Sequence, residues 1–176
     1  PIFADIGFLD EAELALFGTP EGMLRIFSNI SIPGIDATSG SLGHGLGIGS
    51  GYALAAKYDN CPSRVFVILS EGEMYEGSTW ESALFASHRK LDNLVVILDR
   101  NRKIILGDTE DALKLEPVEE KWRSFGFDVF SVDGHSFSDL EEVFKNINNV
   151  DGRPIAIVAN TVKGKGIALM EDEASW

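Results

Sequence analysis

An acidic side chain and an amide side chain follow two apolar segments that are separated by one predicted helix. Glu71 closely follows the apolar run 65–69, and Asn101 comes thirty residues later, after the apolar run 94–99. Strand ends that meet at one edge of a parallel sheet can hold a divalent cation between them. Magnesium takes oxygen ligands, often only one or two protein side chains plus phosphate oxygens. With a nearby backbone carbonyl, the two residues predict a magnesium ion that carries a diphosphate.

Glycines near these residues favour contact with an anion. Gly72 would let the backbone approach a phosphate with no side chain in the way. The segment Gly40-Ser-Leu-Gly43 stands at the predicted start of a helix, where free amide groups can donate to the same anion. The sequence has no G-x-x-x-x-G-K-[ST] motif and no G-x-G-x-x-G motif, so it does not predict a Rossmann dehydrogenase.

Apolar strands alternate with helices along most of the chain. Asp10 and Gly18 bound a predicted short helix over residues 10–18. The later elements are predicted as strands over residues 65–69, 94–99, 128–132 and 155–159, and helices over residues 78–90, 117–125 and 136–147. Continuous apolar strands between helices are typical of a parallel sheet covered on both faces. We therefore predict an α/β fold, a doubly wound parallel sheet with helices on both faces, in a single diphosphate-binding domain over residues 1–176.

A glycine-rich segment precedes the first strand. We predict a helix from about Ser41 to Tyr58, with glycine at positions 43, 45, 47, 49 and 51. Each glycine costs roughly 1 kcal/mol relative to alanine in a helix. Close approach of another backbone or of a ligand would offset this cost, and so would tight helix packing. The sequence leaves these explanations open.

Composition bounds the class of protein. The chain has 176 residues, of which 44% are apolar and 24% charged, which suits one domain with a real core. Its net charge of −13 argues against binding to nucleic acid or to an anionic membrane, since phosphates would be repelled. The single cysteine, Cys61, excludes an internal disulfide and fits a reducing, cytoplasmic location. No apolar run approaches the length of a membrane span.

Four separated motifs carry a family resemblance. In chain order they read TSGSLGHGLGIGSGYALA, EGEMYEGSTWESALFASHRKLDNLVVILDRN, LEPVEEKWRSFGFDVFSVDGH and ANTVKGKGIALMED. Together with the acid-to-Asn spacing, they resemble the thiamine diphosphate-binding domain of transketolases, which some bacteria and archaea encode as a separate N-terminal subunit. The resemblance covers roughly residues 34–175 and implies the thiamine diphosphate-binding fold, with thiamine diphosphate and Mg²⁺ as cofactors.

The resemblance implies roles for particular residues of the metal site. Glu71 stands where the family has its magnesium-binding aspartate, and Asn101 matches the family's asparagine. Lys103 stands where the backbone carbonyl of the family binds the metal. The extra methylene of Glu71 shifts the carboxylate by roughly one C–C bond, about 1.5 Å. The site could re-form around Glu71, could prefer Ca²⁺ or Mn²⁺, or could have lost the metal.

The cofactor contacts are implied in the same way. Gly40, Ser41 and Leu42 match the loop that lies along the cofactor, and Gly72 and Glu73 match the residues next to the diphosphate. These five residues are therefore the expected cofactor-binding set, together with the asparagine of the metal site.

The resemblance further implies an assembly. Glu76 matches a catalytic-site glutamate at the family's dimer interface, where it joins a carboxylate network between active sites. The pyrimidine site of the family lies on a second domain, so a C-terminal transketolase-type subunit or domain is expected as partner, in a homodimer or heterotetramer. The implied reaction is transfer of a two-carbon ketol group between sugar phosphates, as in the pentose phosphate pathway.

Two departures from the family keep other functions open. Residues 24–27 read LRIF, where the family has a substrate-contacting histidine nearby, and Ser70-Glu71-Gly72 replaces the family's GDG. The first departure allows a thiamine diphosphate enzyme of another sugar or 2-oxoacid reaction. The second allows a degenerate, cofactor-free domain kept for assembly.

Overall fold

The computed structural model describes residues 1–147 and 152–175. Contacts divide the chain into two compact units, Pro1–Ser41 and Leu42–Trp176. Every strand and helix that the sequence places around the diphosphate belongs to the second unit. The single domain over residues 1–176 stays a prediction.

The first unit contains short helices. Helix α1 spans Ile2–Asp5 and α2 spans Ala12–Ala15. The helix predicted over residues 10–18 was therefore too long. Asp10 does act near its start, since its Oδ1 accepts a hydrogen bond from the Ala12 backbone N–H at 2.9 Å. A helix of four residues is a single turn, and so short a helix gains few hydrogen bonds to offset the cost of nucleating it.

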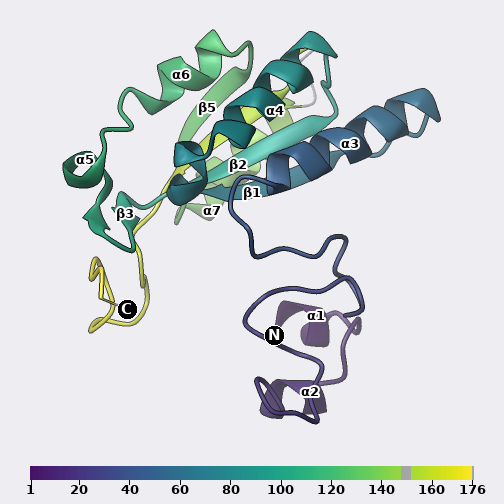
Figure 1. The fold of residues 1–176 in the computed structure, drawn as a ribbon, viewed down its shortest axis with the longest axis vertical. Coiled ribbons are helices and arrows are strands. Elements are labelled where there is room, and N and C mark those ends of the chain that lie inside the picture. Colours follow the sequence, from purple (N-terminus) through teal and green to yellow (C-terminus); the bar gives the residue numbers. More distant parts are fainter. Residues whose placement is uncertain (148–151, 176) are drawn as a thin grey trace. The chain divides into compact units, whose positions relative to one another are not determined.

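A parallel four-stranded sheet forms the centre of the second unit. Its strands are β1 (Val65–Ser70), β2 (Leu94–Arg100), β5 (Asp128–Asp133) and β6 (Ile155–Asn160). Their spatial order is β1-β2-β6-β5, and each neighbouring pair is parallel (Figure 1). All four strands were predicted within one residue of their observed ends, because buried parallel strands have continuous apolar sequences.

Helices cover both faces of this sheet. They are α3 (Gly45–Tyr58), α4 (Gly77–His88), α6 (Val118–Ser124) and α7 (Phe137–Asn146). Helices α3, α4 and α6 contribute Leu46, Ala83 and Trp122 to one buried cluster, and α7 contributes Val143 to the cluster on the opposite face (Figure 1). The predicted doubly wound α/β fold is confirmed. In the described part of the chain, no helix combines the length and apolar character needed to cross a membrane.

The start of α3 differs from the prediction. The helix begins at Gly45, four residues after Ser41. Gly43 has φ +81°, and a Cβ built on it would lie 2.5 Å from Ser78 Oγ and 2.6 Å from Glu76 Cβ. A left-handed residue pressed against the start of α4 cannot continue a right-handed helix, so residues 41–44 form a turn.

The glycines of α3 have different structural environments. A Cβ on Gly49 would lie under 3.0 Å from Cγ2 of Val67 on β1, so this glycine allows close packing of α3 on the sheet. A Cβ on Gly51 would meet no described atom within 4 Å. Tight packing therefore explains Gly49, whereas nothing in the described structure explains Gly51.

These two positions give a matched pair of substitutions. Gly49→Ala should lower the free energy of unfolding by about 1–3 kcal/mol, because the added methyl overpacks a buried helix–sheet contact. Gly51→Ala should raise it by up to about 1 kcal/mol, because alanine favours the helix and meets nothing. Urea unfolding of both variants measures the difference. Equal effects of the two substitutions would contradict the packing account of Gly49.

Candidate functional site

The parallel register brings the ends of β1 and β2 together. Ser70 lies opposite Asp99, so the 3-10 helix η1 (Glu71–Tyr75) and the loop at residues 101–102 leave the same sheet edge. The Arg102 backbone N–H donates to Glu71 Oε1 at 2.6 Å. The short strand β3 (Lys103–Ile104) then pairs with β4 (Gly107–Asp108). The structure thus places Glu71 beside the loop that carries the other predicted metal ligands.

The two carboxylate oxygens of Glu71 have different environments. The residue is 1% exposed. Its Oε1 accepts from the Arg102 N–H and lies 2.9 Å from Arg100 Nη1. Its Oε2 is buried and has no hydrogen-bond partner among the described residues. Burial raises the pKa of Glu71 above its usual value, against the opposing hydrogen bonds from Arg102 and Arg100.

Asn101 and Lys103 are held by their own loop. Asn101 Oδ1 accepts from the Lys103 N–H at 2.9 Å, and its Nδ2 donates to Asp99 Oδ2 at 3.4 Å. Asp99 in turn accepts a hydrogen bond from the Thr161 hydroxyl. The Lys103 side chain points to Asp108, with Nζ 2.6 Å from Oδ1, and this contact raises the pKa of Lys103. The side chain of Lys103 is therefore engaged by Asp108, and the role of its backbone carbonyl as a metal ligand stays a prediction.

The oxygen donors suit a magnesium ion. An orphaned carboxylate oxygen of Glu71 and a side-chain amide oxygen of Asn101 with a remaining lone pair both lie beside one short loop. A hard divalent cation takes oxygen ligands of this kind. No group of three or more His, Cys, Asp or Glu side chains that could hold a metal occurs among the described residues.

The predicted cofactor residues lie around η1 in part. A Cβ on Gly72 would lie 3.7 Å from Leu42 Cδ1, and Leu42 is 50% exposed, so these two residues are neighbours at the surface. Gly40 and Ser41 belong to the first unit, where Gly40 has φ +137° and lies against Phe27.

The two glutamates of this segment differ. Glu73 Oε1 accepts from the Gly43 N–H and Oε2 from the Ser70 N–H, both at 3.2 Å. Its carboxylate therefore closes the capping box of η1 and holds the turn before α3. Glu76 is exposed and stands between η1 and α4. Neither role assigned by resemblance is tested by these contacts, and both stay predictions.

Sequence reasoning missed Arg100 as a site residue. It ends β2, is 1% exposed, and its Nη2 lies 2.6 Å from Glu116 Oε1. A charged residue in an apolar parallel strand signals a buried partner. That signal was present in the run LVVILDR, followed sixteen residues later by an acid.

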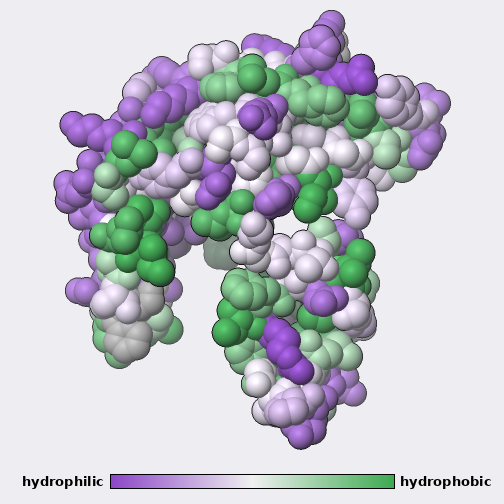
Figure 2. All heavy atoms as spheres, viewed as in Figure 1, coloured by the Kyte–Doolittle hydropathy of each residue, from purple (hydrophilic) through white to green (hydrophobic). Residues whose placement is uncertain are grey.

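Exposed apolar side chains lie close in sequence to the predicted metal ligands Asn101 and Lys103. Ile105 and Leu106, between β3 and β4, are 96% and 80% exposed. Figure 2 shows apolar side chains gathered over this hairpin. The β3–β4 hairpin thus has an apolar surface beside the predicted ligands Asn101 and Lys103.

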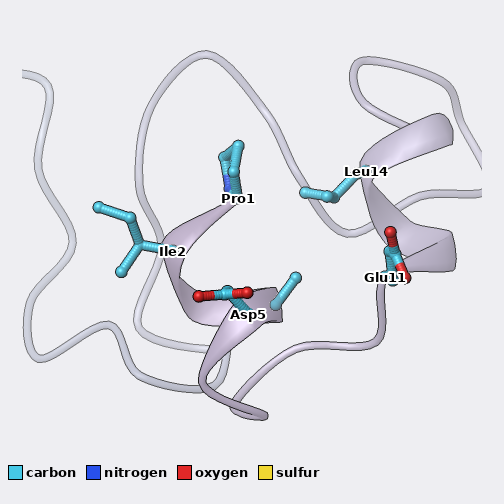
Figure 3. Close-up of a pocket in the computed structure, with 6 residues that line it drawn as sticks. Pro1, Ile2, Asp5, Glu11 and Leu14 are labelled. Carbon is cyan, nitrogen blue, oxygen red and sulfur yellow. The ribbon is translucent and has the colours of Figure 1, made fainter.

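A pocket in the first unit contains none of the predicted ligands. It is lined by Pro1, Ile2, Ala4, Asp5, Glu11 and Leu14 (Figure 3). Its two carboxylates are exposed and bring no buried polar atom to the pocket. The chemistry of the chain therefore concentrates at the sheet edge.

Comparison with known proteins agrees with this geometry. Residues 27–175 match the family described as transketolase, thiamine diphosphate binding domain. The chain belongs to the transketolase family. It also superposes on transketolase from Campylobacter jejuni with a TM-score of 0.88 and 26% identity, over 93% of this chain and 27% of that one.

Curated relatives of this transketolase-family chain include subunits and full-length enzymes. An apulose-4-phosphate transketolase subunit of Phocaeicola vulgatus is 38% identical over 97% of this chain and 60% of its own length. The 6-deoxy-6-sulfo-D-fructose transketolase subunit SqwG of Clostridium sp. is 42% identical over 78% of this chain and 50% of its own. Human transketolase is 40% identical over 99% of this chain and 28% of its own. The chain thus spans at most 60% of these relatives.

The ion pair between Arg100 and Glu116 gives a pH-dependent prediction. The hydrogen bond from Arg100 holds the pKa of Glu116 below its usual value. The contact between Arg100 and Glu116 therefore stabilises the fold fully above the pKa of a glutamate in the unfolded chain, about 4.3. This stabilisation is lost as the pH falls through the lowered pKa of Glu116 in the folded protein. Glu116→Gln should lower the free energy of unfolding by about 1 kcal/mol at pH 7, because Glu116 is partly exposed.

Thermal unfolding between pH 3 and pH 7 measures this difference. The destabilisation should disappear toward pH 3. Glu120→Gln is the matched control, since Glu120 only approaches Arg123 at 3.7 Å on the surface of α6 and should change little. A pH-independent loss in Glu116→Gln would show that packing, and not charge, sets its contribution.

Proposed function

We propose that this chain binds thiamine diphosphate through Mg²⁺ and, with a second subunit or domain, transfers a two-carbon ketol group between sugar phosphates. One observation carries the proposal: Glu71 Oε2 is buried without a partner among the described residues, beside the loop of Asn101 and Lys103. An unpaired buried carboxylate oxygen is costly unless a cation occupies its free side. Membership of the transketolase family supplies the identity of the cofactor.

Three groups of this chain would hold the metal. They are Glu71 Oε2, Asn101 Oδ1 and the backbone carbonyl of Lys103, with diphosphate oxygens completing the shell. Because glutamate reaches further than aspartate, Ca²⁺ or Mn²⁺ could also occupy the site with their less strict geometry.

The surrounding loops would hold the diphosphate. Gly72 offers backbone without a side chain in the way, and Leu42 covers it from the α3 side. Gly40 and Ser41, which precede Leu42 in the chain, belong to the proposed cofactor-binding set on the family resemblance alone. Glu73 would act indirectly, since it fixes the N–H groups of Gly43 and Ser70. When bound, thiamine diphosphate supplies the nucleophilic carbon that takes up and passes on the two-carbon unit.

A partner would complete the active site. The curated relatives from Phocaeicola and Clostridium are named as transketolase subunits, which supports a complementary C-terminal subunit for this chain. We infer a homodimer or heterotetramer in the cytoplasm, with exposed Glu76 in the interface as a catalytic-site carboxylate.

The names of two relatives suggest a range of sugar substrates to test. One is named for apulose-4-phosphate and the other for 6-deoxy-6-sulfo-D-fructose. A panel of ketose phosphates, deoxy sugars and 2-oxoacids, tested with the partner subunit, separates ketol transfer from the alternative reactions. If the complex turns over only 2-oxoacids, the ketol-transfer proposal is wrong and a thiamine diphosphate-dependent 2-oxoacid reaction takes its place.

Removal of a metal ligand tests the cofactor site. Thiamine diphosphate should bind the complex only when a divalent cation such as Mg²⁺ is present, and Asn101→Ala should weaken binding at least about tenfold because the metal loses a protein ligand. Isothermal titration calorimetry with and without Mg²⁺ measures both effects. Asn146→Ala, on the exposed end of α7, is the control and should not change binding.

One outcome would favour the non-enzyme alternative. If the unaltered complex binds no thiamine diphosphate in Mg²⁺, Mn²⁺ or Ca²⁺, but Glu71→Asp does, the metal site has been lost at this one residue. The chain would then be a cofactor-free assembly domain.

A further inference from the structure

Arg100 is a buried cation beside the predicted metal ligand Glu71. Its side chain is 2% exposed, and it ends β2 directly before Asn101. Its Nη1 lies 2.9 Å from Glu71 Oε1 and 3.2 Å from Thr109 Oγ1, and its Nη2 lies 2.6 Å from Glu116 Oε1. An arginine does not lose its proton in a protein, so it stays buried only with such acceptors.

The contact between Arg100 and Glu71 is one-sided. Both donors that reach the carboxylate, Arg100 Nη1 and the Arg102 N–H, approach Oε1. Oε2 receives none among the described residues. Two donors on one oxygen fix the rotation of the carboxylate, and this rotation determines where Oε2 points.

This geometry distinguishes two roles for a guanidinium beside a metal ligand. An arginine that takes the place of the metal would engage both carboxylate oxygens in a fork, the strongest arrangement for such a pair. Arg100 instead uses its second nitrogen on Glu116, and Oε2 has no partner in the described part of the chain. The contacts therefore resemble those of an orienting group beside a ligand.

The local charge agrees with a further cation. Three carboxylates, from Glu71, Glu110 and Glu116, lie within 4.0 Å of the one guanidinium of Arg100. Arg102 also acts on Glu71 and Glu116, but the positive charges are still fewer than the three carboxylates. The buried member of the three, Glu71, keeps an oxygen available for a second cation.

We propose that Arg100 is a positioning residue that pins Glu71 Oε1 and thereby presents Oε2 to the metal, which lets a glutamate serve in this place. The inference rests on the proposed metal role of Glu71. An aspartate at position 71 would withdraw the carboxylate by about 1.5 Å, one C–C bond, and so would lose the contact with Arg100. Arg100 and the length of residue 71 are therefore coupled.

Mn²⁺ affinity measured by electron paramagnetic resonance tests this coupling in the complex with its partner, at saturating thiamine diphosphate. Arg100→Met should raise the Kd for Mn²⁺ by about 10–100-fold, the usual effect of removing a group that orients a metal ligand. In a Glu71→Asp background the same substitution should change the Kd less than about threefold. This double-mutant comparison isolates the pair from a general loss of structure.

Two further variants keep the test decisive. Arg100→Lys keeps the charge, but its single ammonium group cannot contact Glu71 and Glu116 with two separate nitrogens. It should therefore give an intermediate Kd, and it remains informative even if the methionine variant unfolds. Arg123→Met removes an exposed charge on α6 and should leave the Kd unchanged.

The opposite sign would overturn the inference. If Arg100 competes with the metal, Arg100→Met removes a repulsive charge and lowers the Kd. An unchanged Kd, or an equal effect in the Glu71→Asp background, would also reject a positioning role. Absence of Mn²⁺ binding by the unaltered complex would instead reject the proposed function together with this inference.

Discussion

Parallel pairing of β1 with β2 determines where the polar groups of the site lie. With Ser70 opposite Asp99, the residues after both strands emerge at one edge, and Glu71 meets the loop at residues 101–103. The β2–β6 pairing adds Asn160 opposite Arg100, so the segment after β6 reaches the same edge. The sheet core that maintains this register is apolar on both faces. The site is therefore a consequence of strand register, as in other open parallel sheets.

Burial makes the charges at this edge mutually dependent. Glu71 and Arg100 are each 1% exposed, and neither could stay charged there without the other or an equivalent partner. Arg100 Nη2 pairs with the partly exposed Glu116, and Nη1 donates to the buried Thr109 hydroxyl. This chain of contacts links η1, β2 and the segment before α6, so a change in one charge alters the cost of burying the others.

The sequence predicted the sheet better than the site, for physical reasons. Continuous apolar runs identified each strand, whereas the start of α3 depends on Gly43 meeting Glu76 and Ser78, a contact between segments more than thirty residues apart. Glu71 and Asn101 were predicted to lie at one sheet edge because the apolar runs show where the strands end, and the structure brings Glu71 to the loop after Asn101. Arg100 was missed because its partners Glu71 and Glu116 come from other elements, and the capping role of Glu73 depends on Gly43.

The longer side chain at position 71 is best understood through these contacts. A glutamate after β1 reaches Arg100 and the Arg102 N–H with one oxygen, and the other oxygen remains buried and unpaired among the described residues. Burial of that oxygen is costly, since it has given up water without a new partner among the described residues. Under the proposed metal role, a cation bound there would remove the cost, so metal binding and stability would be coupled at this residue. A glutamate in this place is thus compatible with a working site, because the neighbouring arginine contacts the longer side chain.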